Sequence, residues 1–195
     1  MKKPKIEVEK ERQVHTYAEL WYTSKVLLQK GIGEPDGSFH QFMASLVLTA
    51  FSFEAFLNHI GKKLFKSHAW AAIERLSPKE KLHVIAELLN VQIDYGARPW
   101  QIIKTLFDFR NSIAHGKTVT LKESELVAMN DDFDRRFRSI LLTEWEAHCT
   151  RDNADRARED VQTMIETLHK ACNFTDDFPF VPGIQLQGTV GGLLQ

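Results

Sequence analysis

The chain has 195 residues, which is the length of a single domain. Hydrophobic residues make up 43% of it, with 13 Phe and 4 Trp, and charged residues make up 26%, so the composition excludes a globally disordered protein. Lysine and arginine number 25 against 26 acidic residues, which gives a net charge of −1. This balance excludes a protein that holds duplex nucleic acid mainly through bulk positive charge. Nucleic acid remains a candidate partner only where positive charge is locally concentrated.

Neither the cysteines nor the apolar segments suggest a secreted or membrane protein. The two cysteines, Cys149 and Cys172, form no C-x-x-C pair, which is typical of reduced thiols in a reducing compartment. The sequence begins MKKPKIEVEK, where acidic residues stand in place of the apolar stretch of a signal peptide. The longest uncharged run, over 38–53, is shorter than the roughly 18–20 residues of a membrane span. We therefore expect a soluble protein of the cytoplasm with no membrane partner.

The spacing of apolar residues predicts four helices in the first part of the chain. Residues 7–30 mix charged residues with apolar ones spaced mostly by three, four and seven, and the two glycines that follow are expected to end this helix. Residues 38–65 are apolar nearly all round, which predicts the buried central helix. A Ser-Pro-Lys-Glu segment at 77–80 is typical of a capping-box start for the third helix. Pro99 is expected to open the fourth, which extends to residue 115.

The later segments complete the expected fold. Residues 118–121 alternate and are rich in β-forming residues, so we expect a short strand there, paired with residues 184–187. Three further segments have helical patterns: 123–129, 133–148 and 151–172. The fold class is therefore predicted to be all-α, a bundle of four to five long helices with short extra helices. Residues 1–172 are expected to form one domain, followed by an extended C-terminal tail over 173–195.

The most informative stretch is FDFRNSIAHGK, at the end of the fourth expected helix. Successive helical residues turn by about 100°, so Asn111 and His115 share one face, and Asp108 lies a turn earlier. Arg110 flanks that polar face. A permanent cation, an amide and an imidazole are thereby gathered at a helix end, where Gly116 lets the chain turn away and leaves the imidazole accessible.

Two isolated polar residues, Glu54 and Asn58, lie one turn apart on the apolar central helix. A buried carboxylate needs a partner, and Arg110 is the cation that Glu54 could pair with and orient. The alternative is that Glu54 and Asn58 lie on a partly exposed stripe of the helix. The sequence favours neither interpretation over the other.

The segment RNSIAH, with Arg110, Asn111 and His115, resembles the R-x4-6-H motif of the HEPN domain family, in which a polar residue follows the arginine. The resemblance extends over roughly 41–172. It implies a bundle of four or five helices that dimerises so that two motifs face each other. Many members are metal-independent endoribonucleases of toxin–antitoxin, phage-defence and RNA-processing systems, and others are binding modules that have lost the motif. One toxin subgroup carries a tyrosine two residues after the histidine, where this chain has Lys117.

Basic residues outside the motif are candidates for binding RNA, and histidines and cysteines are candidates for binding a metal. Four basic residues are candidates for contacting RNA phosphates: Lys117, Arg135, Arg136 and Arg138. Three aspartates accompany the arginines, so a solvated face with compensating charges is the alternative. No metal site is expected, because the histidines and cysteines near the C-terminus lack the spacing of a zinc site. No cofactor is expected either, because the phosphate-loop, dinucleotide-binding, G-x-S-x-G and HExxH motifs do not occur.

These observations favour a homodimeric, metal-independent endoribonuclease that cleaves single-stranded RNA or an RNA loop. Its composite site would contain Arg110, Asn111 and His115 from each chain, with Glu54, Asn58 and Asp108 in support. A toxin or defence factor is the implied role, with an antitoxin protein as a further candidate partner. The alternative is a non-catalytic helical dimer that binds a nucleotide, RNA or a partner protein.

Overall fold

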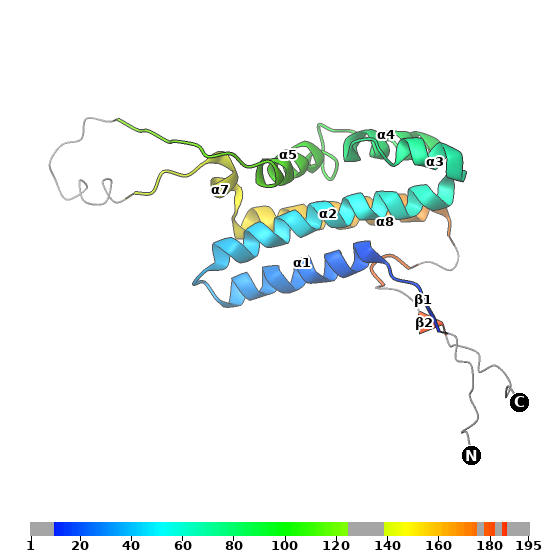
Figure 1. Ribbon diagram of the computed structural model, residues 1–195, viewed down its shortest axis with the longest axis horizontal. Helices are drawn as coiled ribbons and strands as arrows, with labels where there is room; N and C mark the ends of the chain where they lie inside the picture. Colours follow the sequence, from blue (N-terminus) through cyan, green and yellow to red (C-terminus); the bar gives the residue numbers. More distant parts are fainter. Residues whose placement is uncertain (1–9, 125–138, 175–177, 182–184, 187–195) are drawn as a thin grey trace, which may run out of the picture.

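The computed structural model describes residues 10–124, 139–174, 178–181 and 185–186. The described part is all-α, as expected, with five long helices and two short ones. A two-stranded ribbon lies at one end of the bundle (Figure 1). The helices are α1 (Thr16–Gly33), α2 (Ser38–Leu64), α3 (Ser67–Ile73), α4 (Pro78–Leu88), α5 (Ile102–Ala114), α7 (Glu144–His148) and α8 (Arg151–Cys172).

Helix α2 is the centre of the bundle. It packs against α1, α3, α4, α5 and α8, with α1 on one side and α3 to α5 on the other (Figure 1). Its side chains at Phe53, Phe56, Leu57 and Ile60 are fully buried. The nearly continuous apolar sequence of α2 follows from this position, because a helix covered on several sides has little surface to keep polar.

By length and composition, α2 could also cross a membrane. Its packing against five other helices of the same chain buries half of its most apolar stretch.

Two glycines permit close contacts along this core. Gly31, near the end of α1, faces the ring of Phe42, and a Cβ atom added there would lie 2.8 Å from that ring. Gly61, near the end of α2, faces the ring of Trp70, where an added Cβ would lie only 2.1 Å away. The aromatic rings occupy the space that larger residues at these positions would need.

A buried arginine joins α8 to α1. The guanidinium of Arg158 donates to the main-chain oxygen of Trp21 at 2.9 Å and to the hydroxyl of Ser24. It also lies 3.8 Å from the centre of the Trp21 ring. Burial lowers the pKa of Arg158 to about 10, which leaves the group charged at neutral pH. These contacts stabilise the packing of two helices that are far apart in the sequence.

Several expected helix boundaries agree with the structure and others are corrected. The capping box at Ser77 is present, and α8 has the expected bounds. Helix α1 begins at Thr16, well after residue 7, and continues through Gly31 to Gly33. Helix α5 begins at Ile102 because Pro99 lies in the turn before it.

The segment expected to be helical over 133–148 is also corrected. Its described part is irregular over 139–143, and the short helix α7 begins only after Thr143. Thr143 and Glu146 form a capping box that fixes this start. Of the helix expected over 123–129, residues 123 and 124 are irregular and the rest lie outside the described residues.

The prediction that residues 118–121 form a strand paired with the tail is wrong, because the tail pairs with another segment. Residues 118–121 form no strand. In the tail, β2 (Gln185–Leu186) pairs antiparallel with β1 (Glu11–Arg12), before α1. Helix α1 begins at the end of the bundle where α8 ends, whereas the segment after α5 leaves from the opposite end (Figure 1).

The described part of the tail also contacts the helices. The Phe180 ring lies 5.0 Å from that of Trp21, and His15 Nδ1 lies 3.0 Å from the main-chain oxygen of Val181.

Candidate functional site

The expected site lies at the end of α5. The apolar side chains of Ile103, Leu106 and Phe107 are buried and anchor this amphipathic helix against the core. Arg110 and Asn111 belong to its last turns, and His115 is the residue that caps it. The main-chain amide of His115 donates to the oxygen of Asn111 at 2.9 Å, which continues the helical hydrogen bonding to the cap.

Arg110 is held by three neighbours. One Nη2 hydrogen bond goes to Oε2 of Glu54 on α2, so the expected pairing of these residues is confirmed. The Nη1 atom donates to Oδ1 of Asn111 at 2.8 Å, and the guanidinium lies 5.1 Å from the centre of the Phe51 ring. The side chains of Arg110 and Glu54 are 19% and 23% exposed. The pair is therefore partly screened from water but still reachable from one side.

Lys81 on α4 completes this cluster, although it was not among the site residues expected from the sequence. It is only 2% exposed, and its ammonium donates to Oδ1 of Asn58 at 2.7 Å and lies 3.8 Å from Oε1 of Glu54. Burial lowers the pKa of Lys81, Arg110 acts in the same direction, and Glu54 and Glu74 oppose the shift. A chain of polar contacts thus runs from α4 through α2 to α5.

The guanidinium of Arg110 still has donors for an anionic ligand. Arg110 and protonated Lys81 carry two positive charges, which the carboxylates of Glu54 and Glu74 balance. A guanidinium has five N–H bonds, and the contacts with Glu54 and Asn111 use two of those of Arg110. The Nε atom is buried with no hydrogen-bond partner among the described residues. Donors on the terminal nitrogens remain for a further acceptor.

His115 and Asn111 are exposed beside this cluster. Within the described part of the chain, no hydrogen bond to the imidazole of His115 is formed. The ring is therefore accessible at the helix end, as the sequence indicated.

The other expected site residues either lie away from this cluster or belong to the part of the chain that the structure does not describe. Asp108 forms an ion pair of 2.6 Å with Lys104, one turn earlier on α5, and not with Arg110. Lys117 is exposed in the segment that follows α5. Arg135, Arg136 and Arg138 lie outside the described residues.

The described residues offer no arrangement suited to a metal ion. No group of three or more His, Cys, Asp or Glu side chains converges among them. Cys149 is buried and its Sγ lies 3.2 Å from the main-chain oxygen of Trp145. Burial raises the pKa of Cys149 to about 11, and Glu146 acts in the same direction. A thiol in this state is a poor metal ligand and a poor nucleophile.

Comparisons of the chain with protein-family models, with curated proteins and with solved structures found no match. The resemblance to the HEPN family therefore stays a prediction from the motif residues Arg110, Asn111 and His115.

The sequence contained a signal for Lys81. This lysine lies four residues before Ile85 and next to Leu82, so it falls on the apolar side of α4. A charged residue on the apolar face of a helix indicates a buried partner, and that partner is the Asn58–Glu54 pair on α2.

Proposed function

We propose that this protein is a metal-independent endoribonuclease of the HEPN type that cleaves single-stranded RNA or an RNA loop. The observation that supports this most is the fixed position of Arg110, held by Glu54 next to the exposed side chains of Asn111 and His115. A fixed cation, an amide and an accessible imidazole are the groups that internal phosphoryl transfer in RNA requires.

In the proposed reaction, His115 of one chain removes the proton from a ribose 2′-hydroxyl. The 2′-oxygen attacks the adjacent phosphorus, and the bond from phosphorus to the 5′-oxygen of the next nucleotide breaks. His115 of the second chain protonates the departing oxygen. The products are a 2′,3′-cyclic phosphate and a 5′-hydroxyl. The nucleophile belongs to the substrate itself, so no metal-bound water is needed to supply it.

Arg110 and Asn111 act on the phosphate in this scheme. The guanidinium stabilises negative charge on the non-bridging oxygens as the fifth bond to phosphorus forms. Asn111 orients Arg110 through the contact of its Oδ1 atom with Nη1, which leaves the amide nitrogen of Asn111 for a phosphate oxygen. Glu54 is a positioning residue because it holds Arg110, and Lys81 and Asn58 act one step further away, through the contact of Lys81 with Glu54.

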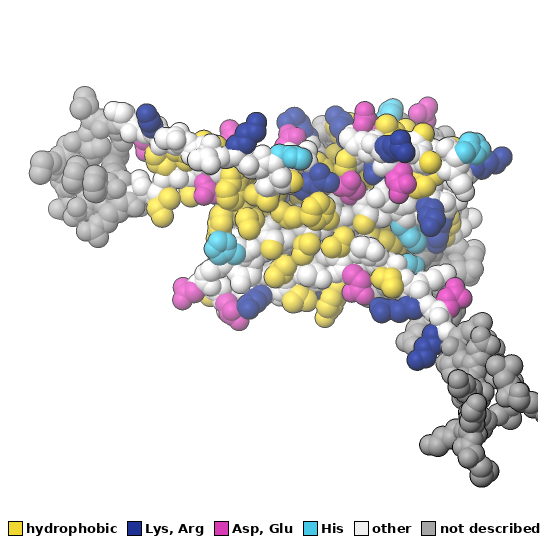
Figure 2. Space-filling model, viewed as in Figure 1, with side chains coloured by type: hydrophobic (Ala, Val, Ile, Leu, Met, Phe, Trp, Pro, Cys, Tyr) yellow, Lys and Arg dark blue, Asp and Glu magenta, His cyan; other side chains and the backbone are white. Residues whose placement is uncertain are grey.

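The proposal requires a homodimer, because each chain supplies one histidine at this place and the reaction uses both a base and an acid. Apolar surface beside Arg110 supports self-association. Phe51 is 37% exposed, and Val47 and Ala55, one turn before and after it on α2, are only partly buried. Figure 2 shows hydrophobic side chains gathered over α2, between α1 and α5. A two-fold contact across this face would bring two helix ends together.

We place this activity in the cytoplasm, as a toxin or defence factor that an antitoxin protein could restrain. Unrestrained cleavage of cellular RNA would stop growth, so such an enzyme needs control by a partner.

One observation favours the alternative of a non-catalytic binding module. Both hydrogen bonds of Arg110 go to side chains of its own chain, and the His115 ring has no partner within the described residues to fix its tautomer. In that case the same surface would hold RNA, a nucleotide or a partner protein without cleavage.

Growth of bacteria that overproduce the full chain distinguishes the two functions. The wild-type protein is expected to arrest growth, and His115→Ala is expected to relieve the arrest at equal expression. His83→Ala is the matched control, because His83 is an exposed histidine on α4. Arrest that persists with His115→Ala contradicts the proposal. Unhindered growth with the wild type, together with RNA bound and uncut by the purified protein, supports the binding module.

A further inference from the structure

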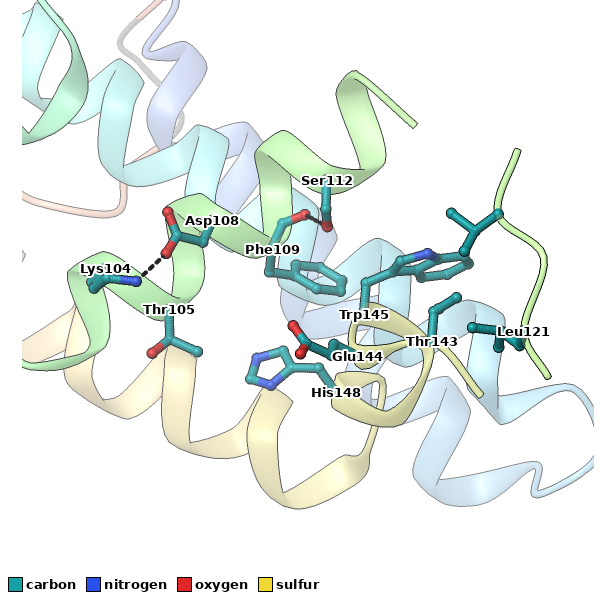
Figure 3. Close-up of a pocket in the computed structure, with 11 residues that line it drawn as sticks. Lys104, Thr105, Asp108, Phe109, Ser112, Leu121, Thr143, Glu144, Trp145 and His148 are labelled. Carbon is teal, nitrogen blue, oxygen red and sulfur yellow. Dashed lines mark hydrogen bonds and ion pairs between the residues drawn. The ribbon is translucent and has the colours of Figure 1, made fainter. Parts of the chain in front are cut away.

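A second feature of α5 is a pocket of about 570 Å³ that is lined by other side chains than Arg110 (Figure 3). It lies between α5, α7 and the segment around residues 119–121. Its volume is within the range of about 300–1,000 Å³ that small-molecule sites occupy. Neither Arg110 nor His115 lines it, so it is distinct from the cluster at the helix end.

The walls of the pocket are suited to a flat ring. Phe109 and Trp145 contribute aromatic surface from α5 and α7, and Val119 and Leu121 contribute aliphatic surface from the segment opposite (Figure 3). The ring of His148 lies 5.2 Å from that of Phe109. Burial lowers the pKa of His148, which favours its uncharged form. Aromatic side chains stack on bases irrespective of sequence, because every base has a π-face.

The negative charge of the pocket lining disfavours the binding of a phosphate in its interior. The lining includes two carboxylates, Asp108 and Glu144, and one ammonium, Lys104, which is paired with Asp108 at 2.6 Å. With His148 uncharged, the lining has a net charge of −1. Carboxylate oxygens accept hydrogen bonds from amino groups, so this lining favours an uncharged ring that carries an exocyclic amino group.

The position of the pocket relates it to the helix end. Ser112 lines it and lies three residues before His115, so about 4.5 Å of helix rise separates the two positions along the axis. A nucleotide next to one bound at the helix end is within reach of the pocket.

We propose that this pocket binds an unpaired, amino-bearing base of the RNA, adjacent to the phosphate that is cleaved. The base stacks against Trp145 and Phe109, and its amino group donates to a carboxylate at the rim. This inference rests on the proposed ribonuclease function. It adds a base preference to that function: adenine, cytosine and guanine carry exocyclic amino groups and uracil does not.

Trp145 provides the signal for a test. The other three tryptophans, Trp21, Trp70 and Trp100, are buried, whereas Trp145 is half-buried in the pocket wall. The full-length protein is titrated with 2′-O-methyl RNA tetranucleotides of A, C, G or U, which lack the attacking hydroxyl. We expect saturable quenching of the fluorescence, with the U tetranucleotide binding most weakly.

Two variants test whether the binding occurs in this pocket. Ser112→Leu narrows it from an exposed position and removes a hydrogen bond to the main-chain oxygen of Phe109. Thr23→Leu is the matched control, because it removes the same kind of bond from the exposed face of α1. Binding to Ser112→Leu should weaken by about tenfold or more through lost stacking, whereas Thr23→Leu should match the wild type within about twofold.

The outcomes separate the pocket from the cleavage reaction. Equal binding by Ser112→Leu and Thr23→Leu overturns the base pocket even if the wild type cleaves RNA. Saturable, Ser112-dependent quenching without any cleavage supports the pocket and contradicts the ribonuclease. Absence of quenching by all four tetranucleotides overturns the proposal and leaves the pocket to an apolar side chain of a partner protein.

Discussion

At the scale of single residues, the structure explains how an arginine at a helix end is kept in one orientation. Arg110 has an acidic partner on α2, an amide partner in its own helix and an aromatic ring beside it. Glu54 is in turn next to Lys81, whose burial leaves it little freedom to move. A guanidinium fixed in this way needs little reorganisation when a phosphate binds, which is the condition under which electrostatic stabilisation is most effective.

Arg110→Lys should test this orientation. An ammonium keeps the charge but loses the planar fork that reaches Glu54 and Asn111 together. We expect the rate of RNA cleavage to fall by roughly 10²–10³, which is the usual cost of losing one stabilising donor. Circular dichroism should show unchanged helical content. A lysine variant that cleaves at the wild-type rate would mean that charge alone matters.

His148 should make stability depend on pH. Because burial lowers its pKa below the ordinary 6.5, the folded protein prefers the uncharged ring, and the unfolded chain takes up a proton more readily. The free energy of unfolding should therefore decrease as the pH falls below about 6.5 towards the folded-state pKa. His148→Phe keeps a ring against Phe109 and should make this decrease shallower in urea unfolding between about pH 7 and pH 5. The same pH dependence in both proteins would contradict this role of His148.

At the scale of helices, close contacts at glycines determine how the bundle packs. Gly61→Ala would place a Cβ atom 2.1 Å from the Trp70 ring, and Trp70 is itself buried. We expect this variant to lose about 1–3 kcal/mol of unfolding free energy through overpacking. Gly33→Ala is the control, since nothing lies within 4 Å of its added Cβ. It should be neutral or slightly stabilising. Equal stabilities of the two variants would show that the contact with Trp70 relaxes freely.

Local signals explain which helices could be predicted from the sequence. Ser77 and Glu80 form a capping box that depends on four consecutive residues, and α8 mixes charged residues with apolar ones at helical spacing. The start of α1 and the partner of the tail depend on pairing between Glu11–Arg12 and Gln185–Leu186. That pairing joins residues far apart in the chain, and helical periodicity contains no information about it.

The same distinction applies to the site. The contact between Glu54 and Arg110 was one of two interpretations of an isolated acid on an apolar helix, and the sequence alone could not decide between them. Lys81 was not predicted to belong to the site. It comes directly after the capping-box residue Glu80, in a charged first turn that is typical of an exposed helix start. The pocket depends on the start of α7 after its N-cap, Thr143, and on the packing of that short helix against α5.

At the scale of the whole molecule, the described part of the tail contributes only partly buried side chains to the bundle. Phe174 and Phe180 are partly buried against the core, whereas the large, fully buried side chains of the described residues all lie within 17–168. Removal of residues 174–195 should leave the helical content of the bundle intact and reduce the unfolding free energy by about 1–3 kcal/mol. Global unfolding of the truncated protein would show that the tail belongs to the core.

The central claim is tested most directly by the chemistry of the RNA ends. The purified protein is incubated with a single-stranded RNA in the presence of EDTA, beside His115→Ala prepared in the same way. We predict that the wild type leaves 2′,3′-cyclic phosphate and 5′-hydroxyl ends, and that His115→Ala cleaves at least about 10²-fold more slowly with unchanged helical content. Intact RNA with the wild type, cleavage that EDTA stops, or equal cleavage by the variant would contradict it.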